Sequence, residues 1–142
     1  MASALVQELR EARFLENMRA FVRHDLAVIE RSMVSDVAME LPGTSWLAGA
    51  YRGHSDVSRG ILALRQVLDS QESHLSFLHE GDQLVVRHDV NVLGPEHEVA
   101  MTLRVRIRFD AEVRMTAIVV EPDDLGLFDH VVNTKLGDRA TA

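Results

Sequence analysis

The stretch ELPGTSWLAGAYRG, residues 40–53, joins a helical first third of the chain to a second half that is rich in predicted strands. This connector holds the only Trp and the only Tyr among 142 residues, Trp46 and Tyr51, in a segment interrupted by Pro and Gly. Such a segment either packs as a tight link between elements or contributes aromatic walls to a binding site. We predict that Trp46 and Tyr51 contact a substrate.

The sequence before the connector is predominantly helical. Apolar residues recur at spacings of three and four between residues 3 and 23, which predicts an amphipathic helix. Asp25 can cap a second helix, and a short strand over residues 37–41 leads into the connector. A third helix is expected after the connector, ending near Ser70.

The remainder of the chain reads as strands separated by turn-forming residues. The four expected strands cover residues 74–80, 83–93, 98–109 and 113–121. Helices followed by an antiparallel meander indicate an α+β fold. The length fits one domain, which we place at residues 1–133, and residues 134–142 are expected to form a frayed tail.

Alternation of side chains assigns the two faces of the predicted sheet. If residues 94–97 close a hairpin, His88 opposes Leu103 on an apolar face, with Val90 opposite Met101 beside them. The other face of the hairpin carries charged residues, including Arg87, Asp89, Arg104, Arg106 and Arg108. A following hairpin closed at residues 110–112 extends the apolar face to Glu121. His88, Glu121 and His79 are therefore the polar groups expected to point into a pocket on that face.

Composition excludes several classes of function. There is no Cys, which removes disulfides and thiolate chemistry, and a net charge of −7 argues against a nucleic-acid partner. No apolar run approaches the length of a membrane span and the start lacks a secretory signal, so we expect a cytoplasmic protein. No metal or cofactor is expected, because His74 and His79 point to opposite faces of their strand and no helical His pair exists.

The pattern resembles the SnoaL-like family of the nuclear transport factor two-like superfamily. The matching segments span most of the chain and lie at residues 35–37, 41–43, 48–53, 109–113 and 123–129. The resemblance implies a curved, mostly antiparallel sheet wrapped by about three helices of the N-terminal half into a cone with an internal cavity. It also implies a homodimer.

The resemblance implies a cofactor-independent cyclase, isomerase or dehydratase that acts on a small apolar metabolite bearing a carbonyl or a ring. His88 is the predicted base, because imidazole can accept a proton near neutral pH, and Glu121 or Glu40 would assist it. Met101, His79 and the two connector rings would contact the substrate. The alternative is a non-catalytic module that binds a ligand or assists assembly.

A third hypothesis comes from the stretch Arg87-His88-Asp89, which looks like the Arg-x-Asp of limonene-type epoxide hydrolases. In that resemblance Arg87 and Asp89 would be catalytic. The position of the second carboxylate of that family falls near Val119 or Val120 in this chain. The base position of ketosteroid isomerases falls at or next to Leu41, with Glu40 adjacent.

Overall fold

The computed structural model describes residues 3–68, 70–93 and 98–140, with the side chains of residues 3–68, 74–92 and 98–135. Within these residues the chain forms four helices and six strands. In chain order they are α1 (Ala4–Arg23), α2 (Leu26–Ser32), β1 (Met33–Leu41), β2 (Gly49–Arg52), α3 (His54–Val67), β3 (Ser70–Glu80), β4 (Gln83–Leu93), β5 (Glu98–Phe109), β6 (Met115–Pro122) and α4 (Leu125–Ala140).

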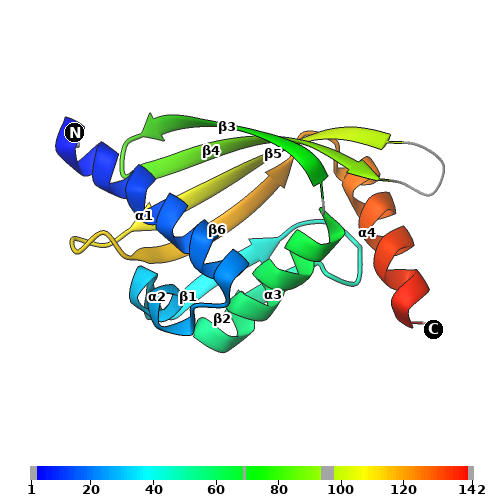
Figure 1. Ribbon diagram of the computed structural model, residues 1–142, viewed down its shortest axis with the longest axis horizontal. Helices are drawn as coiled ribbons and strands as arrows, with labels where there is room; N and C mark the ends of the chain where they lie inside the picture. Colours follow the sequence, from blue (N-terminus) through cyan, green and yellow to red (C-terminus); the bar gives the residue numbers. More distant parts are fainter. Residues whose placement is uncertain (1–2, 69, 94–97, 141–142) are drawn as a thin grey trace.

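The strands form one mixed sheet in the order β2-β1-β6-β5-β4-β3. Only the β1–β6 pair is parallel in the described sheet, and β3 to β6 form the expected antiparallel meander. Helices α1, α2 and α3 lie along one side of the sheet, and α4 lies near one end of it (Figure 1). The predicted α+β architecture is therefore confirmed, with β2 inside the connector as an additional strand.

Local sequence determines where the first two helices begin. The Ser3 hydroxyl accepts a hydrogen bond from Val6 N at 3.2 Å, and the Asp25 carboxylate accepts one from Val28 N at 3.3 Å. Both bonds satisfy amide donors that a helix start leaves unpaired. Asp25 therefore has the capping role predicted from the sequence.

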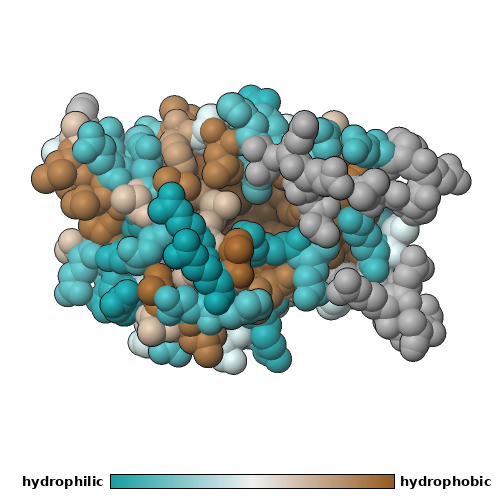
Figure 2. All heavy atoms as spheres, in the orientation of Figure 1, coloured by the Kyte–Doolittle hydropathy of each residue, from teal (hydrophilic) through white to brown (hydrophobic). Residues whose placement is uncertain are grey.

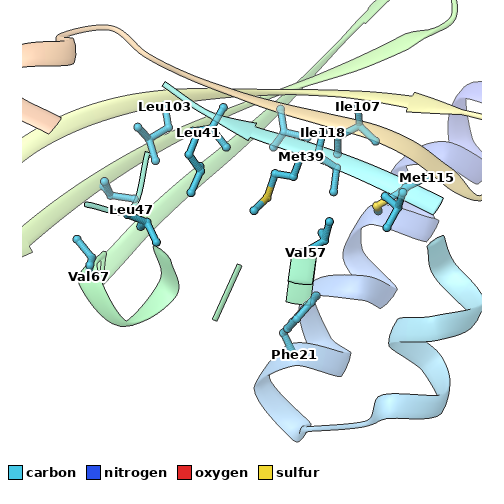
Figure 3. Close-up of a cluster of buried hydrophobic side chains, with 14 of the residues drawn as sticks. Phe21, Met39, Leu41, Leu47, Val57, Val67, Leu103, Ile107, Met115 and Ile118 are labelled. Atoms are coloured by element: carbon cyan, nitrogen blue, oxygen red, sulfur yellow. The ribbon is translucent and has the colours of Figure 1, made fainter. Parts of the chain in front are cut away.

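The core lies between the sheet and its helices. Figure 3 shows part of this core. Side chains such as Met39, Ile107 and Ile118 extend from the strands toward Phe21 and Val57 of the helices. These side chains are almost completely buried. Burial of each such side chain contributes about 1.5–3 kcal/mol relative to exposure.

The register of the β4–β5 hairpin is the predicted one. His88 pairs with Leu103, Val90 with Met101, and the alternation of apolar and charged residues gives the two expected faces. Residues 94–97, which were expected to close this hairpin, lie outside the described residues.

The predicted register of the β5–β6 hairpin is wrong. Val120 pairs with Val105 and Glu121 with Arg104, and an irregularity separates the Arg108 pair from the Phe109 pair. The shift inverts the later part of β6, because adjacent strand positions face opposite sides of a sheet. Glu121 consequently lies on the face away from the helices.

The turn before β6 explains this shift. Asp110 Oδ1 accepts hydrogen bonds from Glu112 N and Arg114 N, both at 2.9 Å, and Asp110 N donates to the Arg114 carbonyl. These contacts hold residues 110–114 in a turn, so the strand begins at Met115 instead of Val113. Val113 itself adopts a left-handed backbone with φ of 59°, which is unfavourable for a β-branched residue.

Because the Val113 backbone is left-handed, we expect a Gly variant at this position to be more stable than an Ala variant, the reverse of the usual order. Val113→Gly is expected to be more stable than Val113→Ala by about 1 kcal/mol, because both lose the two γ-methyl groups and only Gly relieves the left-handed strain. Urea denaturation of the two variants measures this difference. A more stable Ala variant, the usual order in unstrained backbone, would contradict it.

After β6 the chain forms helix α4, and the expected fraying of residues 134–142 stays a prediction. Helix α4 continues to Ala140, and its Phe128, Val131 and Val132 side chains are buried in the core. An apolar face of this kind anchors a helix that polar residues alone would leave free. None of the described helices is long and apolar enough to cross a membrane.

The connector is fastened to α4 through one carboxylate. Asp129 accepts hydrogen bonds from Thr44 N at 3.1 Å, Thr44 Oγ1 at 3.3 Å and Ser45 N at 3.3 Å. Gly43 has φ of +100°, and a Cβ atom there would lie 2.2 Å from Asp129 Oδ1. The close approach of the carboxylate and the positive φ both require Gly at this position.

Candidate functional site

A cavity of about 270 Å³ lies between the helices and the sheet. Figure 2 shows a hollow with apolar walls near the middle of one face of the molecule. Helix α1 contributes Phe14, Met18 and Phe21, α3 contributes Ile61, Leu64 and Leu68, and the strands contribute side chains such as Met39, Leu103, Met115 and Ile118. The volume is close to the lower end, about 300 Å³, of typical small-molecule pockets.

Three polar side chains interrupt these apolar walls among the described residues: Asn17, Arg65 and His88. Asn17 Nδ2 donates to Ser32 Oγ at 2.7 Å, and that hydroxyl donates to the Ile29 carbonyl at 2.8 Å. The Asn17 amide thus links α1 to the end of α2. Arg65 and His88 have no such bonds to other described residues, and both face the space that a ligand would occupy.

His88 lies in the cavity wall where β4 alternation predicted it. Its Nε2 atom is buried and has no hydrogen-bond partner among the described residues. Burial lowers the pKa of His88 below its usual value, the nearby Arg65 charge lowers it further, and Asp89 opposes the shift. The imidazole is therefore neutral at pH 7 and can accept a proton.

The lowered pKa of His88 gives stability a defined pH dependence. Below pH ~6.5 the unfolded chain protonates this residue more readily than the folded protein, so the free energy of unfolding falls as pH decreases toward the folded pKa. Well above pH ~6.5, the ordinary pKa of His, the imidazole is neutral in both states and the stability is fully retained. Urea denaturation from about pH 8 to pH 5.5 should therefore show a smaller loss of stability in His88→Gln than in the natural protein.

The comparison is internally matched, because both proteins share the other six of the seven His residues. The carboxyls of Asp89 and Asp110, whose pKa values are lowered by hydrogen bonds, are also common to both. An identical pH dependence in the two proteins would contradict a lowered pKa at His88.

Arg65 is a cavity-lining residue that the sequence did not single out. It lies on the α3 face that also presents Ile61, Leu64 and Leu68 to the cavity. An Arg on an amphipathic helix normally indicates a solvated position. The signal that could have found it is its place four residues after Ile61, within the apolar stripe of the helix.

The two predicted assisting carboxylates lie away from His88. Glu121 is on the outer face of the sheet, where it forms an ion pair with Arg106. Glu40 is exposed and alternates with Met39 and Leu41, whose side chains face inward. The expectation that Glu121 shares the apolar face is wrong because of the β6 register shift, and Glu40 also lies outside the cavity lining.

Arg87 and Asp89 also lie on the outer face of the sheet. Asp89 Oδ1 accepts hydrogen bonds from Thr102 Oγ1 at 2.6 Å and from Arg87 Nε at 3.2 Å. Strand alternation places both residues opposite the face of His88. The Arg-x-Asp pattern therefore does not enter the cavity, and epoxide hydrolysis there has no support from its position.

The four predicted substrate contacts do not line the cavity. His79 faces inward, but its Nε2 lies 2.6 Å from Glu11 Oε2 of α1, and Met101 is buried beside Val90. The Tyr51 hydroxyl donates to the Leu47 carbonyl at 2.5 Å, within the connector.

Trp46 is 56% exposed, and its amide donates to Asn133 Oδ1 at 3.4 Å. The connector is therefore a packed link in this structure, the first of the two alternatives that its sequence left open. The Asp129 carboxylate of α4 accepts hydrogen bonds from the connector amides of Thr44 and Ser45. These contacts hold the connector against α4.

Within the part of the chain that the structure describes, no group of three or more His, Asp or Glu side chains could hold a metal ion. In the described lining, Arg65 and His88 are the polar side chains without a hydrogen-bond partner. A neutral imidazole can remove a proton from a bound molecule, and a neighbouring guanidinium can stabilise the oxyanion that forms.

No family model matches the sequence, and no curated protein matches it either. Solved structures match it over most of its length. A nuclear transport factor two-like protein from Burkholderia xenovorans LB400 is 18% identical with a TM-score of 0.67, covering 85% of this chain and 94% of its own. A steroid delta-isomerase from Pseudomonas aeruginosa is 21% identical with a TM-score of 0.65, covering 94% and 96%.

A third similar structure is a putative polyketide cyclase from Sinorhizobium meliloti, which is 16% identical with a TM-score of 0.59 and covers 78% and 94%. These similarities show that the chain has the nuclear transport factor two-like fold. The resemblance drawn from the sequence is confirmed at the level of fold, and the cavity between helices and sheet occupies the interior of that fold.

Proposed function

We propose that this protein binds a small, largely apolar molecule bearing a carbonyl or a ring and catalyses proton transfer on it without a cofactor. The observation that carries the proposal is the position of His88. Its ring forms part of the wall of a largely apolar cavity, and its Nε2 atom lacks a partner among the described residues. An unpaired buried polar atom costs about 1–3 kcal/mol, so a ligand group that reaches it gains binding energy.

The proposed reaction is the removal of a proton from a carbon next to a carbonyl. His88 accepts that proton and becomes an imidazolium, while the electron pair of the broken C–H bond moves to the carbonyl oxygen. The imidazolium then returns the proton to the same carbon or to a conjugated one. Neutral imidazole suits the first step because it needs no prior deprotonation at pH 7.

Similarity of fold supports this class of reaction without specifying the substrate. Two of the similar structures are described as a steroid delta-isomerase and a putative polyketide cyclase. A shared fold does not transfer an activity, so the proposal depends on His88 and on the apolar walls around it.

A non-catalytic ligand-binding module is the second candidate function. The observation in its favour is that no Asp or Glu lines the cavity among the described residues, so His88 lacks a carboxylate to orient its ring there. A cavity of this kind can bind a ligand without supplying a complete set of catalytic groups.

Exchange of the α-protons of 2-tetralone in D2O separates the two functions. This ketone has two fused rings and an acidic C–H bond beside its carbonyl, and proton NMR follows its exchange. An enzyme should accelerate exchange above the rate in buffer. The methyl signals of Met18, Met39 and Met115, which line the cavity, report binding in the same sample.

Methyl shifts with accelerated exchange would support the catalytic function. Methyl shifts without acceleration would contradict catalysis and favour the binding module. The signals of Met33 and Met101, which are buried outside the cavity lining, serve as internal controls for a change confined to the cavity.

A further inference from the structure

We propose that the ligand of this cavity carries an anionic oxygen, a carboxylate or the oxygen of an ionised phenol or enol, and that Arg65 binds it. This inference rests on the proposed function and names the class of molecule that the cavity selects. It starts from the placement of a cation in an apolar wall. Arg65 is half-buried and shares its helix face with three apolar lining residues, Ile61, Leu64 and Leu68.

Several other Arg residues of the chain have a carboxylate partner, which Arg65 lacks among the described residues. Arg13, Arg59, Arg87, Arg106 and Arg114 each form an ion pair with a carboxylate. Arg65 forms neither an ion pair nor a hydrogen bond with any residue whose side chain the structure describes. Its side chain lines the cavity, where a ligand can reach the guanidinium.

The charges around the cavity favour an anion. Arg65 is the only cationic side chain in the described lining, no carboxylate competes for it there, and His88 is neutral at pH 7. The protein as a whole carries a net charge of −7, so a local positive site of this kind is not a general property of its surface. A desolvated guanidinium forms strong, often bidentate, bonds to a carboxylate.

His88 lies close enough to Arg65 for the guanidinium to contribute to the lowered pKa of the imidazole. One ligand oxygen can therefore meet the guanidinium while the rest of the molecule rests against His88 and the apolar walls. The arrangement has a polar end at Arg65 and an apolar body facing the sheet. An aromatic or alicyclic acid has the matching distribution of charge and apolar surface.

Binding of 2-naphthoate and its neutral analogue 2-naphthamide tests the inference. The two probes share one ring system, and they differ in the charge of the substituent. The natural protein is expected to bind 2-naphthoate at least about tenfold more tightly, since a bond to a charged group is worth about 1.5–3 kcal/mol. Calorimetry gives both affinities, and the methyl signals of Met18, Met39 and Met115 show that binding is in the cavity.

The variant Arg65→Met keeps an unbranched side chain and removes the charge. It should lose the preference for 2-naphthoate and bind 2-naphthamide as before, whereas Arg65→Lys should retain a preference for the acid. Arg59→Met is the matched control on the same helix, because Arg59 is exposed and pairs with Asp56 outside the cavity. It should bind both probes as the natural protein does.

The outcomes separate this inference from the proposed function. Equal binding of the two probes in the natural protein, with cavity methyl shifts, would overturn the anionic ligand and leave cavity binding intact. A preference for 2-naphthoate that persists in Arg65→Met would assign it to another residue. Absence of methyl shifts with both probes would overturn the inference and contradict binding of ring-bearing molecules in this cavity.

Discussion

Replacing His88 with Gln is expected to lower the protein-catalysed exchange of 2-tetralone α-protons by about 100-fold or more, since a positioned general base contributes about 10²–10⁴ to such a step. Gln retains a polar side chain of similar reach but cannot accept the proton. Arg65 and the apolar walls remain in place, so the ketone should still bind. The effect should therefore appear in the rate constant for exchange at saturating ketone.

Arg87→Gln is the matched control, because Arg87 precedes His88 on the same strand and is exposed on the outer face. Its exchange rate should equal that of the natural protein. Methyl shifts of Met39 and Met115 on addition of 2-tetralone show whether the His88 variant still binds. Unchanged exchange in His88→Gln would remove the role of base from this residue.

Replacing Gly43 with Ala is expected to destabilise the fold by about 3 kcal/mol. About 1–2 kcal/mol comes from the left-handed backbone, and the displaced Asp129 carboxylate loses hydrogen bonds worth about 0.5–1.5 kcal/mol each. The added Cβ would lie only 2.2 Å from Asp129 Oδ1, so the carboxylate cannot keep its bonds to Thr44 and Ser45. Urea denaturation measures the change.

Gly81→Ala separates strain from the collision with Asp129. Gly81 also has a positive φ, of +60°, but no atom lies within 4 Å of a Cβ built there. Its substitution should cost the backbone strain alone, about 1–2 kcal/mol. Equal costs at Gly43 and Gly81 would contradict a specific contact with Asp129.

A double-mutant cycle tests the same contact directly. In an Asp129→Ala background no carboxylate remains to be displaced, so Gly43→Ala should cost less than it does in the natural protein. Independent, additive costs would show that the two positions do not interact.

The β4–β5 hairpin was predictable residue by residue because one local pattern extends along both strands. Apolar and charged residues alternate along both strands, and this pattern fixes which face is buried. The same alternation placed His88 on the inner face. Identification of the predicted base thus depended on short-range pattern and needed no knowledge of the distant helices.

The β5–β6 register and the cavity walls were not predictable in the same way. Residues 117–120 of β6 are all apolar, so alternation does not assign their faces. The turn held by Asp110 and the irregularity beside Phe109 then shift the pairing. Residues 110–114 contain no Gly that would mark the turn in the sequence. Val is also not a residue type that indicates a left-handed backbone, which Val113 adopts. Glu121 was therefore assigned to the wrong face.

Arg65 shows a different limit. A helix stripe defines which residues face inward, but it does not reveal whether the space it faces is filled or empty. The cavity is lined by residues of α1, α3 and the sheet, so its walls come from segments far apart in the sequence. The aromatic connector failed as a guide to the site for a related reason, since Tyr51 and Trp46 satisfy contacts of their own.

The homodimer implied by the family resemblance stays a prediction. The outer face of the sheet combines the side chains of Ala117 and Val119 with an ion-paired network around Arg106. Cross-strand charge pairs of this kind are compatible with a solvated face as well as with an interface.

The parallel pairing of β1 with β6 has a consequence for the order in which this chain can assemble. Met39 on β1 pairs with Ile118 on β6, so two strands that are adjacent in the sheet are separated by most of the polypeptide. During synthesis the first three helices and the β1–β2 pair leave the ribosome long before their sheet partner exists. Closing so long a loop is slow, and we expect the meander to form first and to serve as the template on which the N-terminal half docks.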